Sequence, residues 1–141
     1  MTPTQVKLVQ DSFAKVAPIS EEAAALFYGR LFEIAPEVRP LFKGDMKEQG
    51  RKLMATLAVV VNGLGDLNTI LPAASMLAKR HVAYGVTPGH YAPVGAALLW
   101  ALERGLGAGW TQDLAAAWAA AYATLSGFMI GEAYGRPAAA E

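Results

Sequence analysis

The sequence predicts an all-α domain of six to eight helices, and three observations support this fold class. Nearly every apolar pattern repeats at intervals of three and four residues, which is the helical period. No stretch of useful length alternates apolar and polar residues as a half-buried strand would. With 54% apolar residues among 141, the chain can bury one core. We therefore expect one domain over residues 1–135 and a short alanine-rich tail at 136–141.

Signals for helix starts precede the first two apolar patterns. The run Thr2–Gln5 resembles a capping box with proline at the first helical position. Ser20 is expected to cap the second helix, whose first turn carries Glu21 and Glu22. The apolar residues of these two helices are Val6, Val9, Phe13 and Val16, then Phe27, Tyr28, Leu31 and Phe32.

The middle of the chain predicts a corner and a third helix. Pro36 and Pro40 break the helical pattern and produce a short corner. Asp45 and Glu48 then form a second capping-box pattern, and the helix they begin ends at the glycines in residues 63–65. Its apolar face consists of Leu53, Leu57, Val60 and Leu64.

The last part of the chain predicts three more helices. Pro72 is expected to begin the helix that contains His81, and Thr87–Pro88 the next one. The stretch GLGAGW separates that helix from a last one, which Thr111 caps. No strand precedes these glycines and their spacing fits no phosphate motif, so we expect a turn between helices there.

Composition and charge exclude several classes of protein. Twelve basic residues balance twelve acidic ones, which argues against a nucleic-acid partner or an anionic membrane surface. Cysteine is absent, so disulfides and zinc–thiolate sites are excluded. The start MTPTQVKLVQDSF does not resemble a secretory signal, and we expect a cytoplasmic protein. Residues 114–131 carry no charge, but their alanine content is typical of a buried helix and not of a membrane span.

His81 is the most informative single residue, and the pattern around it leaves two interpretations open. A lone histidine beside apolar residues is commonly a packed core or surface residue. A metal held by protein alone would need further ligands one turn away, where the chain offers Leu77 and Tyr84 instead. A haem supplies four in-plane donors of its own and needs only one histidine.

Five segments together resemble the globins, in particular bacterial single-domain globins of the Hell's Gate type and the globin domain of flavohaemoglobins. They are LFYGRLFEIAPEVRPLF, GRKLM, KRHVAYGV, HYAPVG and AAWAAAY, in the order and spacing of the family. The resemblance implies a globin fold around haem b, with His81 as the proximal iron ligand.

On the distal side, the resemblance assigns roles to five residues. Tyr28 and Gln49 would donate hydrogen bonds to iron-bound oxygen, which carries partial negative charge. Phe42 would pack on the porphyrin, Leu53 would line the pocket and Lys52 would reach a haem propionate. From the residues alone, Tyr28 could instead bond a backbone carbonyl, and Gln49 and Lys52 could face solvent.

On the proximal side, the resemblance assigns Tyr91 and a glutamate to the support of His81. Glu132 falls one place short of the expected position, yet its helical spacing from Trp118 places it on the apolar face. The alternative is a frayed helix end with Glu132 in water. His90 is interpreted as a surface residue. Further pocket-lining positions implied by the resemblance are Val86, Val94 and Leu98.

The function that the resemblance favours is haem-based oxygen chemistry of the nitric oxide dioxygenase type. Oxygen, nitric oxide and carbon monoxide would be the haem ligands. The 141 residues include no flavin domain, so electrons would come from a separate reductase. Reversible oxygen storage or transport, and gas or redox sensing, are the alternatives.

Overall fold

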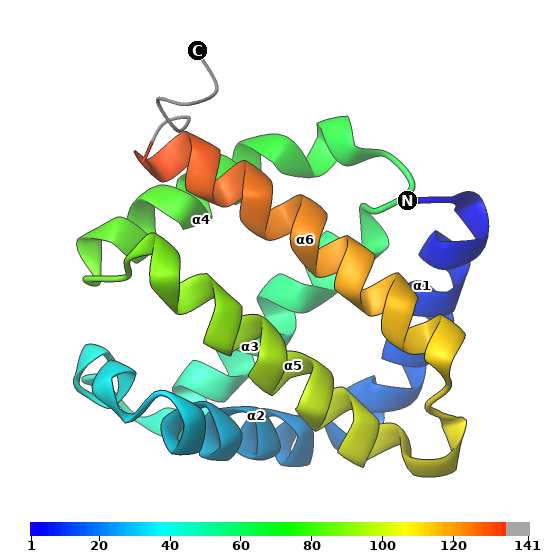
Figure 1. Cartoon of the computed structure of the whole chain (residues 1–141), viewed down its shortest axis with the longest axis horizontal. Coiled ribbons are helices and arrows are strands. Elements are labelled where there is room, and N and C mark those ends of the chain that lie inside the picture. Colours follow the sequence, from blue (N-terminus) through cyan, green and yellow to red (C-terminus); the bar gives the residue numbers. More distant parts are fainter. Residues whose placement is uncertain (135–141) are drawn as a thin grey trace.

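The computed structural model describes residues 1–134, and within them it contains six α-helices and no strand (Figure 1). The helices are α1 (Pro3–Val16), α2 (Ser20–Ile34), α3 (Met46–Asn62), α4 (Leu67–Ala83), α5 (Tyr91–Leu106) and α6 (Gln112–Tyr134). Four short 3-10 turns join them, at Ala17–Ile19, Pro36–Leu41, Pro88–His90 and Gly107–Gly109. The fold class is therefore the predicted one, and the predicted tail at 136–141 lies outside the described residues.

The helices enclose a large core and a smaller one. The large core joins α1, α2, α3, α5 and the first half of α6, and Leu31, Val9 and Val16 are its most completely buried large side chains. The smaller core lies between α4, the start of α5 and the end of α6, around Tyr91 and Met129. In Figure 1, α5 and α6 cross the molecule diagonally, with α3 behind them. α3 packs mainly on α1 and α2, whereas α4 packs mainly on α6.

Three predicted helix starts are confirmed. The Thr2 hydroxyl accepts a hydrogen bond from the Gln5 backbone N–H, and the Gln5 side chain accepts one from the Thr2 N–H. Asp45 caps α3 by accepting from the Lys47 N–H. The Thr111 hydroxyl accepts from the Leu114 N–H at the start of α6. Each cap satisfies a backbone donor that has no partner inside its helix.

Two predicted caps are wrong. Ser20 is the first residue of α2, and its side chain caps nothing because the 3-10 turn Ala17–Ile19 leads directly into the helix. Glu48 does not complete a capping box with Asp45; its carboxylate instead accepts from Arg51, at 2.9 Å one turn further along α3.

The predicted start of α4 is also wrong, because the helix begins at Leu67 and Pro72 lies inside it. A proline within a helix removes one backbone hydrogen bond. Here Asn68, whose carbonyl would accept that bond, is exposed to solvent. The residues ahead of Pro72 nevertheless form helix, because Ile70 buries its side chain in the fold.

α6 is long and apolar enough to cross a membrane by length and composition alone. This is weak evidence, because the core helix of a folded domain passes the same criterion. In the structure α6 packs against α1, α4 and α5 and contributes residues to both cores. Of its most apolar 18-residue window, 28% is buried, so the helix predicted at residues 114–131 packs on the fold along part of its surface and is not buried all round.

Candidate functional site

An aromatic cluster forms one wall of the candidate site. The 3-10 turn Pro36–Leu41 brings Phe42 against Tyr28 of α2, with ring centroids 5.3 Å apart in an edge-to-face arrangement. Phe32 packs against both rings, and its ring centroid lies 6.0 Å from that of Tyr28 and 5.5 Å from that of Phe42. Aromatic rings in this geometry provide a rigid apolar surface. The structure thus brings Tyr28 and Phe42 together, and the packing of Phe42 on a porphyrin stays a prediction.

Tyr28 has a buried side chain beside the first turns of α3. Burial raises the pKa of Tyr28 to about 12, and a hydrogen bond with the Gln49 side chain opposes this rise. The hydroxyl therefore stays protonated at neutral pH and remains a donor. Gln49 is half-buried, and so does not face solvent freely. Together the two side chains place polar hydrogen-bonding groups in an otherwise apolar environment.

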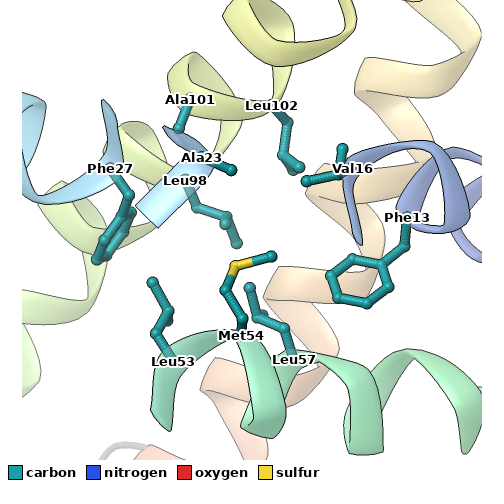
Figure 2. A pocket seen from close by; sticks show the side chains of 10 residues that line it. All are labelled: Phe13, Val16, Ala23, Phe27, Leu53, Met54, Leu57, Leu98, Ala101 and Leu102. Atoms are coloured by element: carbon teal, nitrogen blue, oxygen red, sulfur yellow. The ribbon is translucent and has the colours of Figure 1, made fainter. Parts of the chain in front are cut away.

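Behind these residues lies a small apolar hollow of about 10 Å³ between α1, α2, α3 and α5 (Figure 2). Leu53 and Met54 of α3 point toward Leu98 of α5 across it. The structure therefore brings Leu53 and Leu98 together, and Val94 packs against the same large core. Lys52, next to Leu53, is exposed on α3, and its predicted contact with a haem propionate stays a prediction.

His81 lies in the last turns of α4 with its ring oriented by the backbone. Its Nδ1 lies 2.8 Å from the Leu77 carbonyl oxygen, to which it donates as the neutral tautomer. Burial lowers the pKa of His81, and the bond to Leu77 partly offsets this. A neutral imidazole that donates from Nδ1 has the Nε2 lone pair available for a metal.

The turn after α4 returns the chain toward His81. Gly85 adopts φ +94°, a conformation that favours glycine, and the Val86 N–H then donates to the His81 carbonyl at 3.0 Å. The Tyr134 hydroxyl of α6 donates to the Val86 carbonyl. Val86 packs against the smaller core, beside Tyr91. α6 therefore holds this turn in place.

Tyr91 stacks on His81 at the start of α5. The two ring centroids are 6.4 Å apart and the planes differ by 26°. The Tyr91 carbonyl accepts a hydrogen bond from the Tyr122 hydroxyl of α6 at 2.5 Å. The Tyr91 hydroxyl is buried and has no hydrogen-bond partner among residues 1–134. Burial, followed by the nearby Tyr134, raises the pKa of Tyr91.

Glu132 does not occupy the buried position expected from its spacing. Its side chain is exposed on α6, whereas the next residue, Ala133, packs against the smaller core that contains Tyr91. α6 carries apolar residues on all sides, so the apolar spacing from Trp118 does not identify its buried face. The expected contact of Glu132 with Tyr91 or His81 is therefore absent from this structure.

His90 has a local structural role. Its Nδ1 accepts a hydrogen bond from the Thr87 N–H at 3.1 Å, within a capping box at the turn Pro88–His90. The side chain is half-buried and not fully at the surface as expected. This bond occupies the imidazole as a helix cap.

Sequence reasoning missed three contacts at the proximal side, made by the Leu77 carbonyl, Tyr122 and Tyr134. Tyr122 could have been found from the argument applied to Tyr28, because a tyrosine in an apolar helix needs a partner for its hydroxyl. The Leu77 carbonyl lies one helical turn before His81 within α4, so its bond is local, whereas the Tyr134 contact depends on where α4 ends relative to α6. No local sequence signal carries that information.

The residues of the site fit a haem better than an isolated metal ion. Within residues 1–134 no three His, Asp or Glu side chains gather into a possible metal site. His81 instead presents one neutral nitrogen, and Tyr28 and Gln49 provide polar groups among aromatic and aliphatic side chains. One axial histidine and an apolar pocket with a few polar donors are what a haem requires.

Comparison with known proteins identifies the family. The family model described as Globin matches residues 25–129, and the chain belongs to the globin family. It is 33% identical over 134 residues to the flavohemoprotein of Bordetella parapertussis and 29% identical over 129 residues to that of Rhodopirellula baltica. These matches cover 93% and 89% of this chain but 33% and 32% of the relatives. The chain thus spans about a third of the length of these relatives.

Two solved structures share the fold over nearly their whole length. A bacterial globin from Campylobacter jejuni superposes with a TM-score of 0.82 at 26% identity, covering 94% of this chain and 96% of that one. An engineered carbene transferase, made from a proposed nitric oxide dioxygenase of Rhodothermus marinus, superposes with a TM-score of 0.85 at 26% identity. That match covers 94% of this chain and 93% of the other. The globin fold implies haem and oxygen binding.

Proposed function

We propose that this protein binds haem b with His81 as the iron ligand, binds oxygen there, and oxidises nitric oxide to nitrate with electrons from a separate reductase. The observation that carries the proposal is the pair Tyr28 and Gln49, polar groups in an aromatic and aliphatic wall. The names of the relatives, flavohemoprotein and proposed nitric oxide dioxygenase, support the same chemistry.

When bound, haem supplies an iron that takes diatomic gases and exchanges electrons. The chain's own residues would orient the iron ligand, donate hydrogen bonds to the bound gas and keep water out of the pocket. His81 presents Nε2, because Nδ1 is held by the Leu77 carbonyl. Tyr28 would donate a hydrogen bond from its hydroxyl to a diatomic ligand in the distal pocket, and Gln49 would provide a second polar group. Phe42 and Leu53 exclude water, which strengthens those hydrogen bonds.

The distal donors favour dioxygenase chemistry over oxygen delivery. A hydrogen bond to a partly charged acceptor stabilises the bound state by ~1.5–3 kcal/mol and slows release accordingly. Slow release is a disadvantage for a carrier, whereas a dioxygenase benefits from a ligand that stays bound until nitric oxide arrives. The reaction consumes an electron in each cycle, so it requires a reductase. We propose that this reductase is a separate protein.

Nitric oxide consumption tests the proposed function. Haem-loaded protein with oxygen and an electron-donating flavoprotein should consume nitric oxide and form an equal amount of nitrate. Tyr28→Phe should lower the rate. His81→Ala should lose most haem because it removes the nitrogen that would hold the iron, and the loss of haem should destabilise the folded chain. An alkaline pyridine spectrum identifies the haem as type b. Oxygen binding without nitrate formation above the rate of the His81→Ala preparation would contradict the proposal and favour oxygen storage.

A further inference from the structure

Basic side chains gather in two segments of the chain. Residues 43–52 and 79–80 together carry six basic and two acidic side chains, whereas the rest of residues 1–134 carries five basic and nine acidic ones. A chain without net charge therefore has one strongly positive region. We name its six basic side chains the basic rim: Lys43, Lys47, Arg51, Lys52, Lys79 and Arg80.

The two segments flank the candidate haem site. Residues 79–80 directly precede His81, and residues 43–52 include the first turns of α3, on the distal side. Leu41, just before the first segment, reaches Gly85, just after the second: a Cβ atom at Gly85 would lie 3.1 Å from the Leu41 Cδ2. In Figure 1 the cyan corner before α3 and the turn after α4 lie on the same side of the molecule. The two segments that carry the basic rim therefore approach each other at the contact between Leu41 and Gly85.

The basic rim is free to meet a partner. All six side chains are exposed, and among residues 1–134 only Arg51 pairs with a carboxylate, that of Glu48. Two large apolar side chains beside His81 are also exposed, Val82 at 41% and Tyr84 at 59%. Exposed apolar residues with polar residues around them mark protein interaction sites, and aromatic residues and arginine are enriched there.

We propose that the basic rim, together with Val82 and Tyr84, is the docking surface for an electron-donating protein with acidic side chains around its redox centre. The inference rests on the proposed function, which requires such a donor. Opposite charges steer two proteins together and raise the association rate, while a small apolar contact keeps the complex short-lived. A donor docked here lies next to His81, the residue that would hold the iron.

Anaerobic stopped-flow reduction of the ferric, haem-loaded protein tests the docking surface. The donor is reduced flavodoxin, an acidic flavin protein, and the variant is Lys47→Glu with Arg80→Glu. At low ionic strength the second-order rate constant should fall at least about tenfold. The difference should shrink as salt is raised toward about 1 M, where charges are screened beyond ~3 Å.

Two controls separate docking from general effects. Lys7→Glu with Lys15→Glu changes net charge equally on α1, away from the basic rim, and should keep the flavodoxin rate within about twofold of the original. The photogenerated radical of 5-deazariboflavin, a small donor without net charge, should reduce all three proteins at the same rate. If it reduces the basic-rim variant more slowly, the milder pair Lys47→Gln and Arg80→Gln replaces that variant.

Equal slowing in the two double variants, or a flavodoxin rate that does not depend on salt, would overturn the proposal. Loss of binding to phosphatidylserine vesicles in the basic-rim variant, with an unchanged flavodoxin rate, would assign the surface to a membrane instead. The reaction contains neither nitric oxide nor oxygen. A failure of docking is therefore distinguishable from a failure of nitrate formation.

Discussion

The rings of His81 and Tyr91 lie 6.4 Å apart and nearly parallel, and the buried Tyr91 hydroxyl has no hydrogen-bond partner in residues 1–134. A buried hydroxyl without a partner costs ~1–3 kcal/mol. Tyr91→Phe is therefore expected to raise the free energy of unfolding of the haem-free chain by about 1 kcal/mol, measured by urea denaturation. Tyr122→Phe is the matched control, because it removes a paired hydroxyl and should lower that free energy by about 1 kcal/mol. Changes of the same sign in both variants would contradict the assignment.

Glu132→Gln is expected to leave the iron–histidine stretching band of the ferrous protein unchanged in resonance Raman spectra. The reason is that Glu132 is exposed and makes no contact with His81. Ala133→Glu is the matched change on the buried side of α6, where the side chain faces the core around Tyr91. It should move the band upward, because a carboxylate near the proximal imidazole makes it more electron-donating. A band that moves in Glu132→Gln would restore the sequence-based expectation.

Features that depend on neighbouring residues can be predicted from the sequence, whereas features that depend on tertiary packing cannot. The caps at Thr2, Asp45 and Thr111 are local, since each acts within three residues, and all three were predictable. The start of α4 was not predictable, because the burial of Ile70 depends on tertiary packing. The helix therefore begins at Leu67, ahead of Pro72.

The candidate site divides in the same way. His81, Tyr28 and Phe42 come from segments whose pattern resembles the globins, and the fold brings Tyr28 and Phe42 into contact. The environment of Tyr91 depends on the rotation of α6, which is apolar all round. A helix of that kind has no sequence signal for the face it buries. The positions of Glu132 and Ala133 could therefore be read only from the structure.

Tyr28→Phe is expected to accelerate oxygen dissociation by roughly 10- to 150-fold, the equivalent of losing a hydrogen bond of ~1.5–3 kcal/mol. Carbon monoxide dissociation should change little, because that ligand carries less negative charge. Stopped-flow ligand replacement measures both rates. Tyr84→Phe removes the same atom from an exposed tyrosine and should have no effect. Equal oxygen dissociation rates in the original protein and Tyr28→Phe would mean that Tyr28 bonds another group.

The free energy of unfolding of the haem-free chain should decrease as the pH is lowered, because of His81. Burial lowers the pKa of His81 in the folded chain below its ordinary value of 6.5. As the pH drops below 6.5, the unfolded chain therefore takes up this proton before the folded chain does, which favours unfolding. Above that value both states are neutral at this residue and the contribution vanishes. Urea denaturation from about pH 7.5 to about pH 5 should show stability falling more steeply in the original chain than in His81→Gln. Parallel pH profiles would show that His81 is solvated like an exposed histidine.

Gly95→Ala is expected to destabilise the contact between α5 and α6. A Cβ atom at Gly95 would lie 2.6 Å from Cε2 of Tyr122, so the ring must move and its hydrogen bond to the Tyr91 carbonyl must weaken. Overpacking of this kind lowers the free energy of unfolding by ~1–3 kcal/mol. Gly127→Ala is the matched control on α6, because no neighbouring side chain or other contact lies within 4 Å of its Cβ position, and it should raise stability by about 0.5–1 kcal/mol. Tyr122 also holds the start of α5 beside His81, so Gly95→Ala should accelerate haem loss as well. A haem loss rate equal to that of Gly127→Ala would show that Tyr122 does not support the proximal site.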